Sequence, residues 1–203
     1  MKDWNKLASK ETVEETIKAL KIRGIEAFFV ETGKDAKSKV LGLIPKGAKV
    51  LSSTSRTLDS IGLSEELENA NDFKSARKEF MALDHEKDKE QIRKLRATPD
   101  IIVGSVHAVT KDGRVLIVSN TGSQLAAYVY GAGKVIWVVG VQKIVENLDD
   151  ATKRVYEHIL PLESERLKKL YGVPSNVSKQ LIIDKEVEPG RITIVFVNES
   201  LGF

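Results

Sequence analysis

Hydrophobic positions along the chain follow two periods. Between residues 4 and 22, apolar side chains recur at helical spacing, at Leu7, Val13, Ile17 and Leu20, and Gly24 ends the pattern. Short uninterrupted apolar runs elsewhere are typical of buried strands. They predict strands over residues 25–30, 49–52, 100–103, 134–140, 181–184 and 192–197. Helical spacing predicts further helices over residues 33–44, from 56 onward, 84–96 and 148–170, whereas residues 62–80 are charged and irregular.

Strands that alternate with helices indicate βαβ units, so we predict an α/β fold: a mostly parallel sheet flanked by helices. The run over residues 134–140 shows no polar alternation, which is typical of a central strand covered on both faces. The chain contains no linker or internal repeat. We therefore predict a single domain over residues 1–203, with an N-terminal helix over residues 2–23 packed on the α/β core.

Residues 105–120 interrupt the alternation of strands and helices and predict an inserted β-hairpin. The dipeptide Asp112-Gly113 lies between two β-rich runs, which predicts a type I′ turn with these two residues at its centre. Counting back from that turn places Ser105 opposite Asn120, with His107 on the same face of the sheet. The three side chains would then reach one small ligand. A shift of the register by one residue would separate them.

Polar turns follow three of the predicted strands, after residues 52, 119 and 140. In an open α/β sheet, ligands bind at the carboxyl ends of the strands. Hydroxyls and free backbone N–H groups at helix starts suit a carboxylate or phosphate, although the same residues also serve as ordinary helix caps. The candidate ligand-binding residues are Ser53, Thr54, Ser55, Arg56, Ser105, Asn120, Thr121, Gly122, Ser123, Gln124 and Lys143, and the candidate catalytic residue is His107, as a proton donor or acceptor.

Composition narrows the classes of function. The chain has 32 basic and 29 acidic residues, a net charge of +3 and no Cys, which excludes disulfide scaffolds and thiolate sites. Charges of both signs are mixed along the chain, and no apolar run approaches the roughly 18 residues that span a bilayer. We expect a cytoplasmic protein without nucleic-acid or membrane partners. Glycine-rich nucleotide motifs, zinc-protease motifs and nucleophile elbows are missing, so we expect no cofactor and no metal.

Several segments, taken in order, resemble the LUD domain of the LutC/YkgG family of lactate-utilisation proteins. They are residues 104–110 (GSVHAVT), 119–124 (SNTGSQ), 135–140 (VIWVVG) and 142–145 (QKIV). The resemblance implies a fold similar to the NagB/RpiA/CoA-transferase superfamily. It also implies a link to the oxidation of lactate to pyruvate, beside partner subunits that carry iron–sulfur clusters. Because this chain has no Cys, it could hold no such cluster itself.

One departure from that superfamily concerns the nucleophile. Its CoA transferases use a glutamate that lies just before a glycine, and in residues 120–122 of this chain Asn120 takes the corresponding place. A neutral amide cannot form the acyl anhydride that a carboxylate forms. The sequence therefore disfavours CoA transfer.

Three hypotheses follow. The first is a protein that serves 2-hydroxy-acid (lactate) metabolism and binds a small anionic metabolite at the strand ends, where Arg56 or Lys143 pairs with the anionic group. The second is an accessory or regulatory subunit, without chemistry of its own, of an iron–sulfur oxidoreductase that oxidises lactate. The third, by fold analogy alone, is a sugar-phosphate or CoA-ester enzyme.

Overall fold

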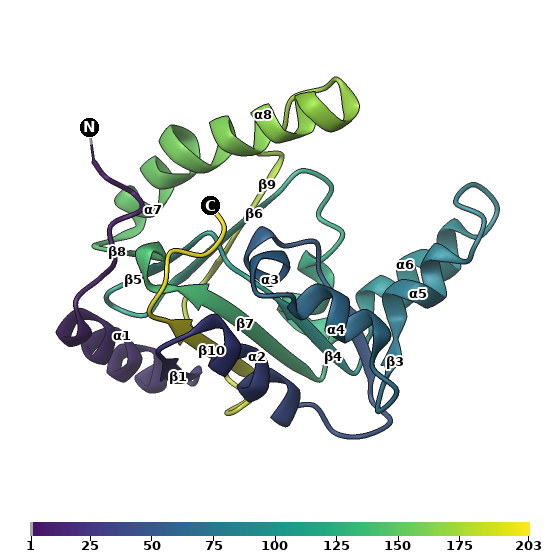
Figure 1. Ribbon diagram of the computed structural model, residues 1–203, viewed down its shortest axis with the longest axis horizontal. Helices are drawn as coiled ribbons and strands as arrows, with labels where there is room; N and C mark the ends of the chain where they lie inside the picture. The colour runs from purple at the N-terminus through teal and green to yellow at the C-terminus, as the bar shows by residue number, and fades with distance from the viewer. Residues whose placement is uncertain (1) are drawn as a thin grey trace.

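The computed structural model describes residues 2–203, so Met1 of the predicted domain lies outside the described residues. Six of its strands form a parallel sheet in the order β1-β10-β7-β4-β2-β3 (Figure 1). They are β1 (Glu26–Val30), β2 (Lys49–Ser52), β3 (Lys74–Ser75), β4 (Ile101–Gly104), β7 (Lys134–Gly140) and β10 (Ile192–Val197). Each neighbouring pair is parallel.

Helices cover this sheet on both faces, which confirms the predicted α/β class. They are α1 (Lys10–Ile22), α2 (Gly33–Gly42), α3 (Arg56–Ser60), α4 (Leu63–Asn69), α5 (Ala76–Met81), α6 (Lys89–Ala97), α7 (Leu148–Arg154) and α8 (Leu160–Tyr171). Two π-helical turns, η1 (Ala127–Gly131) and η3 (Val155–Ile159), and one 3₁₀ turn, η2 (Val141–Lys143), complete the helical segments. Within residues 2–203, no helix is both long enough and apolar enough to cross a membrane.

Strand β7 lies between β10 and β4 and divides its side chains between two hydrophobic cores. Successive strand residues point to opposite faces of a sheet. Ile136 and Val138 pack with α2, α3 and α4, whereas Trp137 packs on the other face with α1 and the second sheet. Only Lys134 of this strand is not fully buried. The prediction of a central strand covered on both faces is confirmed.

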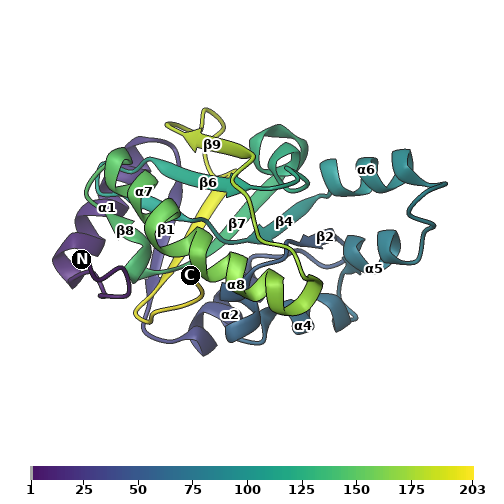
Figure 2. The same cartoon turned by 90° about the horizontal axis from the view of Figure 1, so that it is seen from above.

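The hairpin belongs to a second sheet with the order β8-β5-β6-β9. Its strands are β5 (Ala108–Thr110), β6 (Val115–Ser119), β8 (Ile144–Val145) and β9 (Lys179–Ile183). One face packs toward the parallel sheet through Val109 and Ile117, and the other packs under α7 and η3 through Leu116 (Figure 2). The molecule is thus layered, with helices, the parallel sheet, the smaller sheet and the α7–α8 segment in succession.

The turn of the hairpin is not the predicted type I′ turn. Gly113 has a φ of +86°, and within residues 2–203 no residue other than glycine has a positive φ. The Gly113 N–H donates to the Thr110 carbonyl at 2.8 Å, and the Thr110 N–H donates to the Arg114 carbonyl at 2.8 Å. This is a three-residue loop that ends in a left-handed glycine. Consequently Ala108 pairs with Leu116, one residue earlier than the predicted register.

The N-terminal helix begins at Lys10 rather than at residue 2. Ser9 Oγ accepts a hydrogen bond from the Thr12 N–H at 3.2 Å, which caps the helix and fixes its start. The preceding segment takes a different course, because Trp4 is buried against the α7 core and not on the α1 stripe. Of the predicted stripe, Val13 and Leu20 are buried in the same core as Trp137 and Ile17 packs against it, whereas Leu7 precedes the helix and is 40% exposed.

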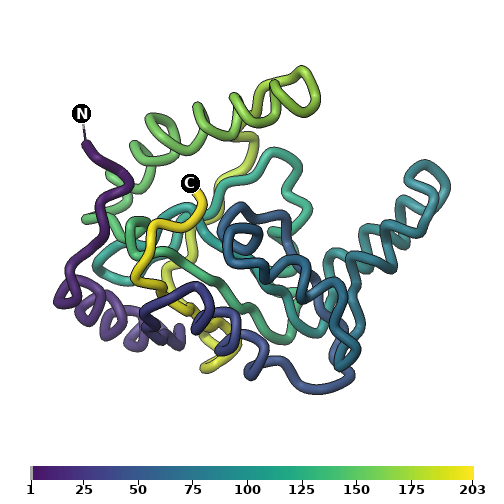
Figure 3. The backbone as a smooth tube through the Cα atoms, viewed as in Figure 1, coloured from purple at the N-terminus to yellow at the C-terminus, as the bar shows by residue number. Residues whose placement is uncertain are grey.

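The segment that gave no sequence pattern contains α4, β3 and most of α5. Leu63 and Leu67, one helical turn apart, are buried and hold α4 on the sheet. The predicted helix over 84–96 begins later, at Lys89, because the Asp84 carboxylate accepts backbone N–H groups and forms a turn before it. Helices α5 and α6 form an arm that projects from the body of the molecule (Figure 3).

Candidate functional site

A cavity of about 420 Å³ lies at the carboxyl ends of β2, β4 and β7. Segments that directly follow these strands form its floor, while α8 and the α5–α6 arm supply other parts of the wall. Eleven predicted site residues line it: Ser53, Thr54, Ser55, Arg56, Ser105, His107, Asn120, Thr121, Ser123, Gln124 and Lys143. Gly122 does not line this cavity and instead faces a neighbouring groove. The functional role of these residues remains a prediction.

The shared location of Ser105, His107 and Asn120 does not come from the predicted hairpin register. Pairing in the hairpin begins only at Ala108, and residues 105–107 connect β4 to β5 across the end of the parallel sheet. Asn120 lies beyond the end of β6, where its side-chain carbonyl accepts a hydrogen bond from Ser178 Oγ at 3.0 Å. The three residues line the same cavity because three chain segments meet there.

Lys143 lies at the floor of the cavity and is 3% exposed. Its Nζ donates to Thr57 Oγ1 at 2.8 Å, to Ser105 Oγ at 3.2 Å and to the Val106 carbonyl at 3.3 Å. All three acceptors are neutral. Burial, and then the positive charge of Arg154, lower the pKa of the Lys143 amino group to about 7.

Arg154 lies behind the cavity floor at the end of α7 and is completely buried. Its Nη1 donates to the His107 carbonyl at 3.0 Å, whereas its Nε and Nη2 have no hydrogen-bond partner within residues 2–203. Burial lowers the pKa of Arg154 to about 10. Within the same residues, no carboxylate lies within ion-pair distance of Arg154 or of Lys143. The Arg154 guanidinium, and the Lys143 ammonium whenever it is protonated, are therefore buried without a carboxylate partner, an arrangement that favours an anion nearby.

His107 is held as a neutral hydrogen-bond donor. The Val118 N–H donates to Nδ1 at 3.1 Å, so the ring proton belongs on Nε2. Burial, followed by the charges of Lys143 and Arg154, lowers the pKa of His107 to about 3. Near neutral pH the ring can donate a hydrogen bond from Nε2, but its basic nitrogen is occupied. This geometry favours a binding role for His107 over the predicted role as proton acceptor.

Tyr128 forms part of the wall between the strand ends. Its hydroxyl lies 3.1 Å from Ser53 Oγ, and its ring makes an edge contact with Trp137 at 5.3 Å between centroids. Burial raises the pKa of Tyr128 to about 12, so the phenol is neutral. Gly104 is required below it, because a Cβ at this position would lie 1.9 Å from the Tyr128 hydroxyl.

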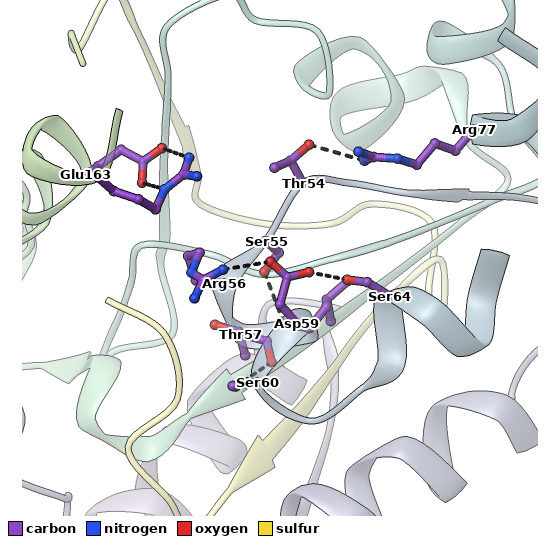
Figure 4. A network of polar contacts seen from close by, with 11 residues as sticks. Thr54, Ser55, Arg56, Thr57, Asp59, Ser60, Ser64, Arg77 and Glu163 are labelled. Atoms are coloured by element: carbon purple, nitrogen blue, oxygen red, sulfur yellow. Dashed lines mark hydrogen bonds and ion pairs between the residues drawn. The ribbon is translucent and has the colours of Figure 1, made fainter. Parts of the chain in front are cut away.

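Several charged residues that line the cavity already have polar partners (Figure 4). Arg56 Nη1 lies 3.3 Å from the Asp59 carboxylate, and Arg77 Nη1 donates to Thr54 Oγ1 at 3.2 Å. On α8, Glu163 forms a two-point ion pair with Arg166, at 2.8 and 2.6 Å. The predicted cation Arg56 is thus already partly neutralised within its own helix.

The turn after β6 uses some of the backbone groups that were predicted to bind an anion. The Gly122 N–H donates to Ser119 Oγ at 2.9 Å, and the Ser123 N–H contacts Thr121 Oγ1 at 3.3 Å. These two N–H groups therefore have partners inside the turn. The helical segments that follow these turns, α3 and η1, have only five residues each, so their dipoles add little attraction for an anion.

Several cavity residues were not among the predicted site residues. Thr57 follows Arg56 directly and is buried against Lys143, whereas Arg77, Arg96 and Arg166 come from helices remote in sequence. No local motif marks these three, because the arm and α8 reach the cavity only through the tertiary fold. Within residues 2–203, no cluster of three or more His, Cys, Asp or Glu is arranged to hold a metal ion.

Comparison with known proteins gives one family and a related fold. The LUD domain family model matches residues 13–197. A DUF162 family protein from Deinococcus radiodurans, solved as a crystal structure, is similar with a TM-score of 0.58 and 12% identity, over 95% of this chain and 100% of that chain. A D-ribose-5-phosphate isomerase in complex with phospho-erythronic acid matches with a TM-score of 0.41 and 15% identity, over 83% of this chain and 95% of that chain. A search of curated proteins found no match.

Proposed function

The chain belongs to the LUD domain family, and from that premise we propose that it binds a small anionic metabolite, a 2-hydroxy or 2-oxo acid, in the cavity at the strand ends. The LUD domain is associated with lactate-utilisation proteins in general. The resemblance of residues 104–110 and 119–124 to the LutC/YkgG branch supports lactate or pyruvate as the ligand.

The observation that carries this proposal is the buried positive charge. Within residues 2–203, Lys143 donates only to neutral oxygens, and two guanidinium nitrogens of Arg154 have no partner. A buried charge without a counter-ion is costly, so a carboxylate that enters the cavity is favoured by attraction to Lys143. The Nε2–H of His107 and the hydroxyls of Ser105 and Thr57 are polar groups of the kind that orient such a ligand.

Titration calorimetry tests the proposal with matched ligands. We expect lactate and pyruvate to bind the wild-type protein, and lactamide, which has the same shape without the charge, to bind at least tenfold more weakly. Lys143→Met is expected to abolish the preference for the charged ligand. Lys153→Met, a change at an exposed residue beside Arg154, serves as the control. Equal affinities for lactate and lactamide, or heats equal to dilution for every acid, would refute the proposal.

A second candidate is a non-catalytic subunit of an iron–sulfur lactate-oxidation complex. One observation favours it: two basic groups that line the cavity are already engaged, since His107 Nδ1 accepts from the Val118 N–H and Glu163 is paired with Arg166. A binding or regulatory role needs no free base. Reconstitution with an iron–sulfur subunit separates the two candidates. A non-catalytic subunit requires a stable complex whose rate of lactate oxidation changes when the cavity ligand is added. It also requires that this chain alone gives no turnover.

A further inference from the structure

Five cationic side chains line the cavity, and they fall into two groups. Three have a carboxylate partner, in the pairs Arg56–Asp59 at 3.3 Å, Arg77–Glu68 at 3.1 Å and Arg166–Glu163 at 2.6 Å. Lys143 and Arg96 have none within residues 2–203. The cavity wall thus carries two cations without carboxylate partners on two unrelated elements, one at the end of β7 and one at the end of α6.

Arg96 is fixed against the wall rather than extended into water. Its guanidinium lies 4.3 Å from the centre of the Phe80 ring, and its buried Nε has no hydrogen-bond partner in the described part of the chain. An arginine in the last turn of a helix ordinarily complements the helix dipole and points to solvent. Here burial, and then the charge of Arg77, lower the pKa of Arg96, so a second cation is close to it. An anion at this point would offset both the burial of the guanidinium and its repulsion from Arg77.

A groove of about 480 Å³ continues from this point between α6 and residues 121–126. It shares Arg96, Thr121 and Ser123 with the cavity, and it adds two basic residues from α6, Arg93 and Lys89, of which Lys89 is paired with Glu86 at 2.7 Å. No Asp or Glu is among the residues that line it within the described chain. The two hollows therefore meet at Arg96, and the basic wall extends from the cavity onto α6.

We propose that the natural ligand carries two anionic groups, a carboxylate at Lys143 and a phosphate monoester at Arg96. The proposal rests on the proposed function for the carboxylate end. Lys143 has three neutral partners in an enclosed floor, which suits a small anion with one charge. Arg96 lies where the cavity opens onto further basic residues, which suits a phosphate dianion, and the guanidinium plane matches phosphate oxygens. The ligand class is thus a phosphorylated hydroxy acid, and unphosphorylated lactate fills only the inner part of the site.

Pairs of compounds that differ only in the phosphate test this inference. D-glycerate against 3-phosphoglycerate, and gluconate against 6-phosphogluconate, provide two lengths. In wild type we expect the phosphate to tighten binding about tenfold or more, as one charge-assisted contact does. Arg96→Gln is expected to remove that gain and leave the affinity for glycerate and gluconate unchanged. Lys94→Gln, at an exposed α6 residue paired with Glu90, is the control and is expected to preserve the gain.

Each outcome bears on one part of the argument. If the phosphate gives no gain in wild type, or if Arg96→Gln weakens both members of each pair equally, the inference is wrong while the carboxylate site stands. If the phosphorylated acids bind and respond to Arg96→Gln but not to Lys143→Met, the phosphate contact stands and the proposed carboxylate site fails. If none of the four compounds binds, both fail. Circular dichroism and thermal melting of each variant identify any loss caused by misfolding.

Discussion

Replacing Lys143 by Met is expected to change how stability depends on pH. The side chain is buried, so the folded state resists its protonation, and burial together with Arg154 lowers its pKa from 10.5 to about 7. Between these two values the unfolded chain holds the proton more tightly than the folded chain. The free energy of unfolding therefore rises as the pH increases through this window.

The size of the effect follows from the two pKa values. One pKa unit corresponds to about 1.4 kcal/mol, so the fold opposes the charged form of Lys143 by about 5 kcal/mol at pH below 7. This destabilisation should decrease by about 2 kcal/mol between pH 7 and pH 9. The neighbouring groups do not change charge in that interval. The pKa of His107 is about 3, that of Arg154 about 10 and that of Tyr128 about 12.

Urea denaturation at pH 7 and pH 9 measures the effect. The methionine side chain is apolar and of similar length, so the variant lacks the buried charge and its pH dependence. We expect the difference in unfolding free energy, variant minus wild type, to fall by about 2 kcal/mol from pH 7 to pH 9. Groups that titrate elsewhere contribute equally to both proteins and cancel. Lys153→Met, which removes an exposed lysine near Arg154, should show no such change.

A parallel pH dependence in the two proteins would refute the reasoning. It would mean that Lys143 titrates alike in the folded and unfolded chains, and hence that water or a counter-ion reaches Nζ. The main support for an anion site would then be lost as well. If the difference in unfolding free energy falls by about 2 kcal/mol without lactate but stays constant in saturating lactate, the Lys143 charge interacts with the bound ligand.

Two further substitutions test the structure around the site. Gly104→Ala should lower the unfolding free energy by about 2 kcal/mol, because its Cβ would overlap the Tyr128 hydroxyl. Measured by urea denaturation, this loss should be smaller in the Tyr128→Phe background, which lacks that hydroxyl. Glu186→Gln should cost about 3 kcal/mol, because it leaves the almost fully buried Arg191 guanidinium, now 2.6 Å from the carboxylate, without a counter-charge. Glu188→Gln, at an exposed residue nearby, should change the melting curve little; equal losses would contradict the role given to the buried pair.

The sequence pattern predicted the parallel sheet well because burial of both faces leaves a continuous apolar run. Strand β10 was predicted with its observed bounds, and β7 was predicted as central. The hairpin register was wrong for the same physical reason. Both of its faces are buried, so Ala108 and Val109 are equally apolar and the pattern cannot select one register. The turn selects it, and the glycine conformation that decides the turn type is shared by several loop classes.

The candidate site was predictable as far as it follows the strand ends. Ser53 and Ser105 come directly after parallel strands and Lys143 ends the short turn after β7, and parallel topology alone brings such residues to one edge. Arg96 was missed because the arm reaches this edge through packing of Phe80 and Ile92, which leaves no local signature. The hydrogen bonds of the N–H groups at residues 122 and 123 could not be predicted either, because nearby hydroxyls can accept from them without altering any sequence motif.

The charge pattern connects stability with binding in this fold. Apolar side chains at positions 143 and 154 would fill the same volume without the cost of burying charge. The unliganded protein is therefore less stable than the same fold with apolar side chains at these two positions. An anion bound in the cavity should restore part of that loss in unfolding free energy. Binding should also raise the pKa of Lys143, since a nearby negative charge favours the ammonium form. Above pH 7 the ligand then brings a proton with it, which couples occupancy of the cavity to the acidity of its surroundings.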